Sequence, residues 1–201
     1  RHIHGNANEP QVRAAIKDAL AGKLPQATAP KTLTGEFGSE ADAQKALDWL
    51  RGKKIGAVGD APIGFTPCIY DAKQIFSTFG LDIRQITIDD AFGRISEVKQ
   101  EARELAYANA VAAQPSLTAV NVEEAKKVYG VEVALDEWRK EEVLDAIAIR
   151  CWPEFPTDLG ACICSSLGRL SDRGTVTTCE RDVLGAVTMM VCESLGSDEN
   201  Y

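Results

Sequence analysis

Residues 54–88 read KIGAVGDAPIGFTPCIYDAKQIFSTFGLDIRQITI, and this stretch decides the fold class. The apolar run at 54–58 is typical of a short buried strand, and residues 71–79 have the apolar spacing of a helix that Gly80 ends. Residues 82–88 then alternate apolar and polar side chains, as a half-buried strand does. A strand, a helix and a second strand in succession predict neighbouring parallel strands of an α/β protein.

The same alternation continues toward the C-terminus. Residues 146–150 (AIAIR) and 176–179 predict two more strands, and a closing helix is expected at 182–195, with Asp182 as its N-cap. Further helices are expected at residues 10–24, 39–50, 95–112, 121–130, 136–144 and, partly irregular, 159–170. The sequence therefore predicts a Rossmann-like open parallel sheet with helices on both faces.

The composition changes near residue 35. The stretch LPQATAPKTLTG at 24–35 is rich in proline, threonine and alanine, which is typical of a linker. We therefore expect residues 1–35 to form an N-terminal appendage and linker, such as the end of a preceding domain, and residues 36–201 to form the Rossmann-like domain. Because the sequence starts with Arg1 and not with methionine, we expect it to be a segment of a longer polypeptide.

The overall charge argues against nucleic acid as a partner. The 201 residues carry 22 basic and 30 acidic side chains, a formal net charge of −8, which repels a phosphate backbone. No stretch approaches the roughly 18 consecutive apolar residues that a membrane span needs, and no signal segment is visible at the start. These features predict a cytoplasmic protein without a membrane partner.

Six cysteines and two histidines limit the possible chemistry. In a reducing cytosol we expect the cysteines to be free, partly buried thiols. Cys162 and Cys164 form a close pair, but structural zinc sites usually have two such pairs. Since His2 and His4 lie at the extreme terminus, no nucleophile–histidine pair can be drawn in the body of the chain.

Acidic residues follow three of the predicted strands. In open parallel sheets, ligands bind beyond the carboxyl ends of the strands. The acids in the loops there are Asp60, Glu154, Asp158, Glu180 and Asp182. Spacing alone favours a capping role for Asp182 and leaves the role of Glu180 open. The glycines Gly56, Gly59 and Gly64 do not have the spacing of a dinucleotide-binding loop, so a plain turn is favoured there.

The C-terminal part of the chain resembles the L-fucose isomerase family. The similarity is densest from Ile149 to Leu195, where CWPEF is followed by a strand and then by CERDVLGAVTMM. In that family a strand leads into a helix with the pattern E-x-D-x-x-x-(G)-A-x-x-M, in which the glycine is optional; here the segment contains Glu180, Asp182, Gly185-Ala186 and Met189. The resemblance extends more loosely back to about residue 45.

This resemblance implies a metal-dependent aldose–ketose isomerase that acts on an open-chain sugar through an enediolate and assembles as a homo-oligomer. The divalent ion is usually Mn²⁺, or another oxygen-preferring ion such as Mg²⁺. Glu180 occupies the position of a metal ligand and catalytic carboxylate. The family's Asp and His ligands lie beyond the helix, and no matching residue follows Leu195-Gly196, so the segment holds one of the three ligands. Trp152 and Glu154 follow the predicted strand at 146–150 and are candidates for binding the sugar, Trp152 by stacking; the alternative is that Trp152 packs beneath the loop.

Two alternatives remain open. The first is a non-catalytic carbohydrate-binding or regulatory α/β domain, which would bind sugar without metal. The second is a redox or metal-cluster module that uses the cysteines.

Overall fold

The computed structural model describes residues 9–21 and 39–196, and the chain divides into two compact units, Arg1–Phe37 and Gly38–Tyr201. In the first unit, helix α1 (Pro10–Leu20) begins with a proline, whose fixed φ suits the first helical turn. The predicted stop at Gly22 and the predicted linker at 24–35 lie outside the described residues.

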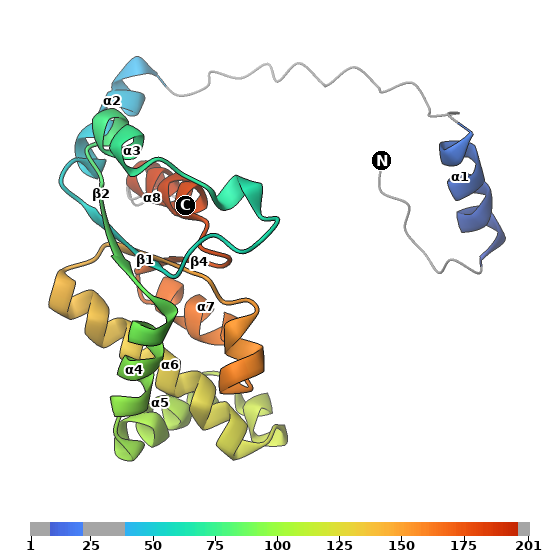
Figure 1. Ribbon diagram of the computed structural model, residues 1–201, viewed down its shortest axis with the longest axis vertical. Helices are drawn as coiled ribbons and strands as arrows, with labels where there is room; N and C mark the ends of the chain where they lie inside the picture. The colour runs from blue at the N-terminus through green and yellow to red at the C-terminus, as the bar shows by residue number, and fades with distance from the viewer. Residues whose placement is uncertain (1–8, 22–38, 197–201) are drawn as a thin grey trace. The chain divides into compact units, whose positions relative to one another are not determined.

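The second unit contains the predicted alternation of strands and helices (Figure 1). Its elements are α2 (Glu40–Leu50), β1 (Lys54–Val58), η1 (Thr66–Cys68), α3 (Ala72–Phe79), β2 (Asp82–Ile86), α4 (Ile88–Glu97), α5 (Gln100–Ala113), η2 (Pro115–Ala119), α6 (Val122–Glu142), β3 (Ala146–Ile149), the π-helical turn η3 (Phe155–Leu159), α7 (Cys164–Asp172), β4 (Val176–Thr178) and α8 (Val183–Gly196).

The four strands form one parallel sheet in the order β2-β1-β3-β4, so the predicted fold class is confirmed. From β1 the chain crosses first to β2 on one side and later to β3 on the other. Strand order therefore reverses between β1 and β3, and such a reversal leaves a crevice at the carboxyl ends of the two strands, where ligands bind in open α/β sheets.

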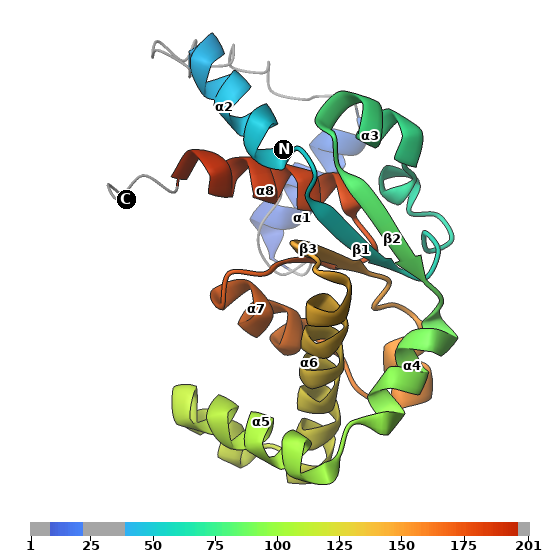
Figure 2. The same ribbon diagram turned by 90° about the vertical axis from the view of Figure 1, so that its left-hand side faces the viewer.

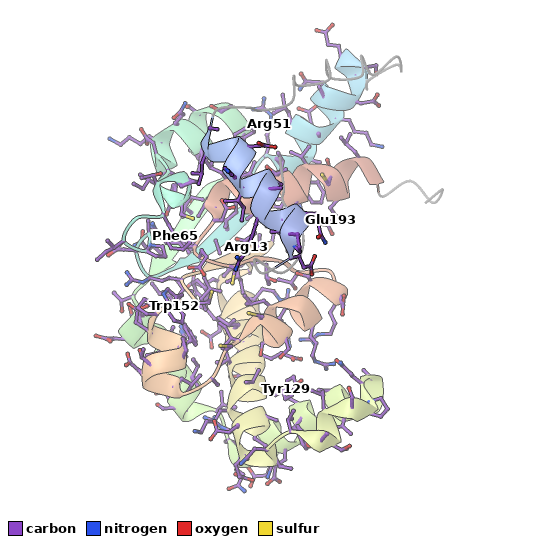
Figure 3. All side chains as sticks on the ribbon, turned by 90° about the vertical axis from the view of Figure 1, so that its right-hand side faces the viewer. Arg13, Arg51, Phe65, Tyr129, Trp152 and Glu193 are labelled. Carbon is purple, nitrogen blue, oxygen red and sulfur yellow. The ribbon has the colours of Figure 1, made fainter. Side chains whose placement is uncertain are left out.

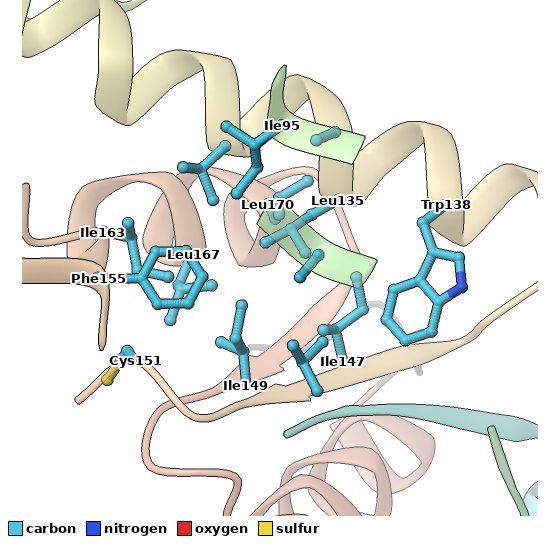
Figure 4. Packing of buried hydrophobic residues seen from close by; sticks show 14 of the residues in the cluster. Ile95, Leu135, Trp138, Ile147, Ile149, Cys151, Phe155, Ile163, Leu167 and Leu170 are labelled. Atoms are coloured by element: carbon cyan, nitrogen blue, oxygen red, sulfur yellow. The ribbon is translucent and has the colours of Figure 1, made fainter. Parts of the chain in front are cut away.

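Helices cover both faces of the sheet (Figure 2). On one face α4, α6 and α7 pack on Ile147 and Ile149, together with Trp138 and Phe155 (Figure 4). On the other face α2, α3 and α8 pack on the smaller side chains of Ala146 and Ala148. Because successive side chains of a strand point to opposite faces, the sequence AIAI alone divides the core into a bulky and a close-packed half.

Strand β2 is shorter than predicted. It ends at Ile86 and not at residue 88, because Thr87 is the N-cap of α4. The Thr87 hydroxyl accepts a hydrogen bond from the Asp90 amide at 3.0 Å, and the Asp90 carboxylate accepts one from the Thr87 amide at 3.0 Å. This capping box starts a helix where alternation of apolar residues predicted continued strand.

The single helix predicted at 95–112 is wrong, because the chain breaks at Val98 between α4 and α5. The Arg103 side chain closes the break: its guanidinium donates to the carbonyl oxygens of Ile95 and, at 3.1 Å, of Val98. Carbonyls in the last turn of a helix lack the usual partner four residues on; the Ile95 carbonyl accepts from the Val98 amide at 3.3 Å, and an arginine from the next helix adds hydrogen bonds to both carbonyls.

The predicted stop at Gly130 is also wrong, since α6 runs without interruption from Val122 to Glu142. A methyl group at Gly130 would lie 2.6 Å from Nη1 of Arg103, so the glycine makes room for that side chain. Asp136, predicted to cap a separate helix, instead accepts from Arg139 at 3.0 Å and pairs with Lys140 within the same helix. The Arg103 side chain thus contacts both the end of α4 and the middle of α6.

None of the helices in residues 9–21 and 39–196 combines the length and the apolar character that crossing a membrane requires.

Candidate functional site

The turn between β4 and α8 has the most unusual backbone in the described part of the chain. Glu180 and Arg181 both have left-handed backbone angles, with φ values of 55° and 58°. Non-glycine residues rarely adopt this region, and each such residue costs about 1–3 kcal/mol unless the surroundings compensate. The turn lies at the carboxyl end of β4, the edge at which the sequence predicted a site.

The carboxylate of Glu180 is incompletely satisfied. Its Oε2 atom is buried and has no hydrogen-bond partner among the described residues, while Oε1 lies 3.5 Å from the Sγ atom of Cys151. A buried carboxylate oxygen without a partner is costly, and a positively charged ligand would remove that cost. The expectation that Glu180 faces an open cleft stays a prediction: five cavities of about 280 to 490 Å³ lie elsewhere, and none of these five is lined by Glu180.

Two thiols lie directly beside this carboxylate. The Sγ atoms of Cys151, after β3, and Cys179, after β4, are 2.7 Å apart. A hydrogen bond with Cys151 lowers the pKa of the Cys179 thiol, and the same hydrogen bond, together with burial, raises the pKa of Cys151. Either sulfur can donate in this contact, and Cys179 is the sulfur that more readily carries negative charge.

All six cysteines are free, as predicted, but their burial was predicted only in part. Cys68 and Cys151 are buried and Cys179 is partly buried, whereas Cys162, Cys164 and Cys192 are exposed. The close pair in the structure joins residues 28 positions apart and not the sequence neighbours Cys162 and Cys164.

Arg181 connects this turn, which follows the outer strand β4, with β2, the outer strand at the opposite edge of the sheet. Its guanidinium donates to the Tyr70 hydroxyl and to Oε1 of Gln85, both at 3.0 Å, and stacks over the Tyr70 ring at 4.7 Å. Gln85 in turn donates to Asp60, at 3.2 Å. Burial raises the pKa of Tyr70, against the opposing effect of the Arg181 charge, so the phenol stays protonated. The network spans the sheet edge from the β4 turn to β2.

Asp182 caps α8, as predicted. Its Oδ1 atom accepts a hydrogen bond from the Gly185 amide at 2.8 Å, and a side chain at Gly185 would collide with the Asp182 carboxylate. The Thr178 hydroxyl also donates to the Asp182 carbonyl oxygen at 2.8 Å, which ties the end of β4 to the start of α8. The two acids of the turn therefore differ: Asp182 caps the helix, whereas Glu180 leaves its Oε2 atom without a hydrogen-bond partner among the described residues.

Trp152 and Glu154 lie in the segment between β3 and η3 (Figure 3 labels Trp152). Trp152 is 52% exposed, so it does not pack beneath the loop and is free to stack on a ligand. Glu154 accepts a hydrogen bond from the Arg150 guanidinium at 2.9 Å. Asp158, another of the predicted acids, accepts a hydrogen bond from the neighbouring Thr157 hydroxyl and is exposed on η3.

Among the possible ligand atoms at the turn, the carboxylate of Glu180 is the one that fits an oxygen-preferring divalent cation. The unpartnered Oε2 atom of Glu180 suits Mn²⁺ or Mg²⁺, which prefer oxygen ligands, and within the described residues the other donors beside it are the sulfurs of Cys151 and Cys179. The sequence missed these thiols and Arg181, because only the pairing of β3 with β4 and the crossing network show that they converge. The one usable signal was their position directly after predicted strands.

Comparison with known proteins gives relatives of one kind. No protein-family model matches the chain. A sulfoquinovose isomerase of Alkalicoccus urumqiensis is 32% identical over 150 residues, which cover 74% of this chain and 33% of that protein. Sulfoquinovose isomerases of Priestia megaterium and of a Clostridium species are each 29% identical, over 174 and 145 residues.

The chain spans about a third of the length of these curated relatives. The similarity covers 71% to 82% of this chain, so it includes most of the α/β unit. The chain is thus related, at about 30% identity, to part of a sugar isomerase.

Proposed function

We propose that this chain is the part of a metal-dependent aldose–ketose isomerase of the L-fucose isomerase type that supplies the carboxylate of Glu180. The observation that carries the proposal is the buried, unpartnered Oε2 atom of Glu180 on a left-handed turn at the carboxyl edge of a parallel sheet. The relationship to sulfoquinovose isomerases supports the reaction class. The use of Mn²⁺ or Mg²⁺, a homo-oligomeric assembly and a cytoplasmic location belong to the same proposal.

Isomerisation moves a carbonyl group between two neighbouring carbons of an open-chain sugar. The bound divalent ion supplies Lewis-acid stabilisation of the charge that develops on the two adjacent sugar oxygens. Glu180 would hold the ion through the oxygen that has no partner among the described residues, and its carboxylate would accept and return the proton that moves between the carbons. Ligands from other parts of the polypeptide complete the coordination of the ion.

The neighbouring residues position the carboxylate and the sugar. Arg181 holds the turn through Tyr70 and Gln85, which keeps the strained backbone at Glu180 in place. The exposed Trp152 ring stacks on the apolar face of the sugar. Glu154, oriented by Arg150, accepts hydrogen bonds from sugar hydroxyls. The substrate to test first is sulfoquinovose, the sugar that names the relatives.

The test is the Glu180→Gln variant of the full-length polypeptide, which keeps the size of the side chain and removes its charge. Ketose formation from sulfoquinovose, with L-fucose as the comparison sugar, should fall to below about one-hundredth of the unchanged enzyme's rate. Mn²⁺ occupancy, measured by electron paramagnetic resonance, should fall with it.

Two controls separate this effect from a general loss of charge. Glu193→Gln changes an exposed glutamate on α8 and should leave rate and occupancy unchanged (Figure 3 labels Glu193). Asp182→Asn should affect metal binding less than Glu180→Gln, because Asp182 caps the helix. A Glu180→Gln enzyme that isomerises at nearly the original rate with full Mn²⁺ occupancy would refute the assignment.

A further inference from the structure

The three donor atoms at the β4 turn converge from two neighbouring strands. Single ligand atoms of Cys151, Cys179 and Glu180 all lie within 4.8 Å of one another. Cys151 follows β3 and the other two follow β4, and the two strands pair directly through Ala148 and Thr178. The pairing of the two strands therefore brings the two halves of the cluster side by side.

The left-handed turn explains how two consecutive residues both reach Cys151. In a continuous strand, successive side chains point to opposite faces, so Cys179 and Glu180 would diverge. Strand β4 ends at Thr178, and with φ at 55° Glu180 brings its Oε1 atom to 3.5 Å from the Cys151 sulfur, while Cys179 is in contact with the same sulfur. The backbone strain thus gathers three donors on one side.

The types of donor identify the class of ligand. Thiolates favour thiophilic ions such as Zn²⁺, whereas Mn²⁺ and Mg²⁺ favour oxygen. Two sulfurs and one carboxylate, with a further position left for water, make a three-ligand zinc-class site. Tetrahedral zinc with bonds of about 2.3 Å would separate its two sulfurs by about 3.8 Å, so the thiols need to move apart by about 1 Å. Cys151 lies in the segment after β3, outside the hydrogen-bonded register, where such a movement leaves the sheet intact.

We propose that Cys151, Cys179 and Glu180 form a binding site for a thiophilic divalent cation of the zinc class. The buried Oε2 atom of Glu180, which has no partner in the described part of the chain, is the independent sign that the cluster is built for a cation. The binding of an ion at this site does not depend on the proposed isomerase function. One consequence of binding rests on that function: a zinc-class ion would occupy Glu180 and compete with Mn²⁺ for this carboxylate.

The experiment uses Co²⁺ as a spectroscopic probe of the chain, kept reduced with a phosphine. The background is the triple variant Cys162→Ser, Cys164→Ser, Cys192→Ser, which removes the exposed thiols and leaves the cluster unchanged. We expect one Co²⁺ per chain, with the ultraviolet thiolate-to-cobalt charge-transfer band and the intense visible bands of a tetrahedral site. Zn²⁺ should displace the probe stoichiometrically.

Single changes in this background assign the ligands. Cys151→Ser or Cys179→Ser should weaken Co²⁺ binding by more than about 100-fold, since even outer-shell changes cost 10- to 100-fold. Glu180→Gln should keep the charge-transfer band and weaken binding at least about tenfold. Circular dichroism of each variant establishes that it is folded.

The triple variant tests the proposed site by itself, even if the single variants do not fold. If it is folded and reduced and shows no charge-transfer band with Co²⁺, the inference is wrong. It is also wrong if the band persists in Cys179→Ser. Mn²⁺ binding to the full-length polypeptide distinguishes the two proposals, because it should depend on Glu180 and survive the cysteine changes. Thiolate-bound Co²⁺ without Mn²⁺ binding would leave this site standing and remove the isomerase assignment.

Discussion

Two glutamates, Glu132 and Glu180, are in opposite situations. Glu132 on α6 is 4% exposed, and both of its oxygens are paired: Arg169 of α7 donates to one at 2.8 Å, and Arg173, the C-cap residue directly after α7, donates to the other at 2.5 Å. Glu180 has one buried oxygen without a partner and a left-handed backbone. The first carboxylate joins α6 to the C-terminal end of α7, whereas one oxygen of the second has no hydrogen-bond partner in the described part of the chain.

The difference shows how structural and functional carboxylates can be told apart. A buried charge is tolerated in a fold when it is paired and hydrogen-bonded, as Glu132 is. A carboxylate that stays partly unsatisfied, on a turn that itself stores strain, is not explained by stability and points to a ligand. The comparison therefore predicts opposite effects of the same chemical change at the two positions.

The largest effect on stability is expected at Glu132. Glu132→Gln removes the charge between two arginines and should lower the free energy of unfolding by about 3 kcal/mol, the lower end of the range for breaking a buried pair, because both arginines keep access to water. Urea unfolding of the chain measures it. The matched control is Glu141→Gln, whose surface pair with Arg94 should contribute less than about 1 kcal/mol. Equal losses at the two positions would contradict the structural role of Glu132.

A smaller effect is expected at Asp182, in the same turn as Glu180. Asp182→Ala removes the N-cap hydrogen bond to the Gly185 amide and should cost about 1 kcal/mol of unfolding free energy. Asp182→Asn should restore most of it, since asparagine caps a helix about as well as aspartate. If alanine and asparagine destabilise equally, the carboxylate has a role other than capping.

The smallest effect on stability is expected at Glu180. Glu180→Gln should change the unfolding free energy by less than about 0.5 kcal/mol or raise it, because the buried oxygen that is replaced has no hydrogen bond to lose. Thermal unfolding without metal, compared with the unchanged chain, measures this. A loss of more than about 1 kcal/mol would mean that Glu180 holds the fold and would remove the contrast with Glu132.

The architecture was predictable because local patterns dominate it. The parallel sheet follows from four short apolar runs separated by helical stretches, and the observed strands begin where the patterns begin, at residues 54, 82, 146 and 176. Two of the errors, at Val98 and at Gly130, lie where Arg103 reaches from α5 to the end of α4 and lies against Gly130 in α6. Such a contact joins residues far apart in sequence, so no local window contains it.

The sequence predicted where the candidate site lies but only some of the residues that form it. Glu180 was found from its place after a strand and from the resemblance to isomerases, and Trp152 and Glu154 from the neighbouring loop. The roles of these three residues stay predictions. The thiols of Cys151 and Cys179 were expected merely to pack, because their separation of 28 residues hides their contact.

The sequence by itself determined the class of fold, the edge of the sheet that carries the acids and the cap at Asp182, because periodicity, the alternation of strands and helices along the chain, and capping are local properties. Only the tertiary structure decided which side chains meet. The pairing of β3 with β4 and the left-handed turn at Glu180 bring two thiols and an unsatisfied carboxylate together, and Arg181 locks that turn across the sheet. Contacts of this kind depend on the register of neighbouring strands, and one residue of slip would turn each side chain to the opposite face.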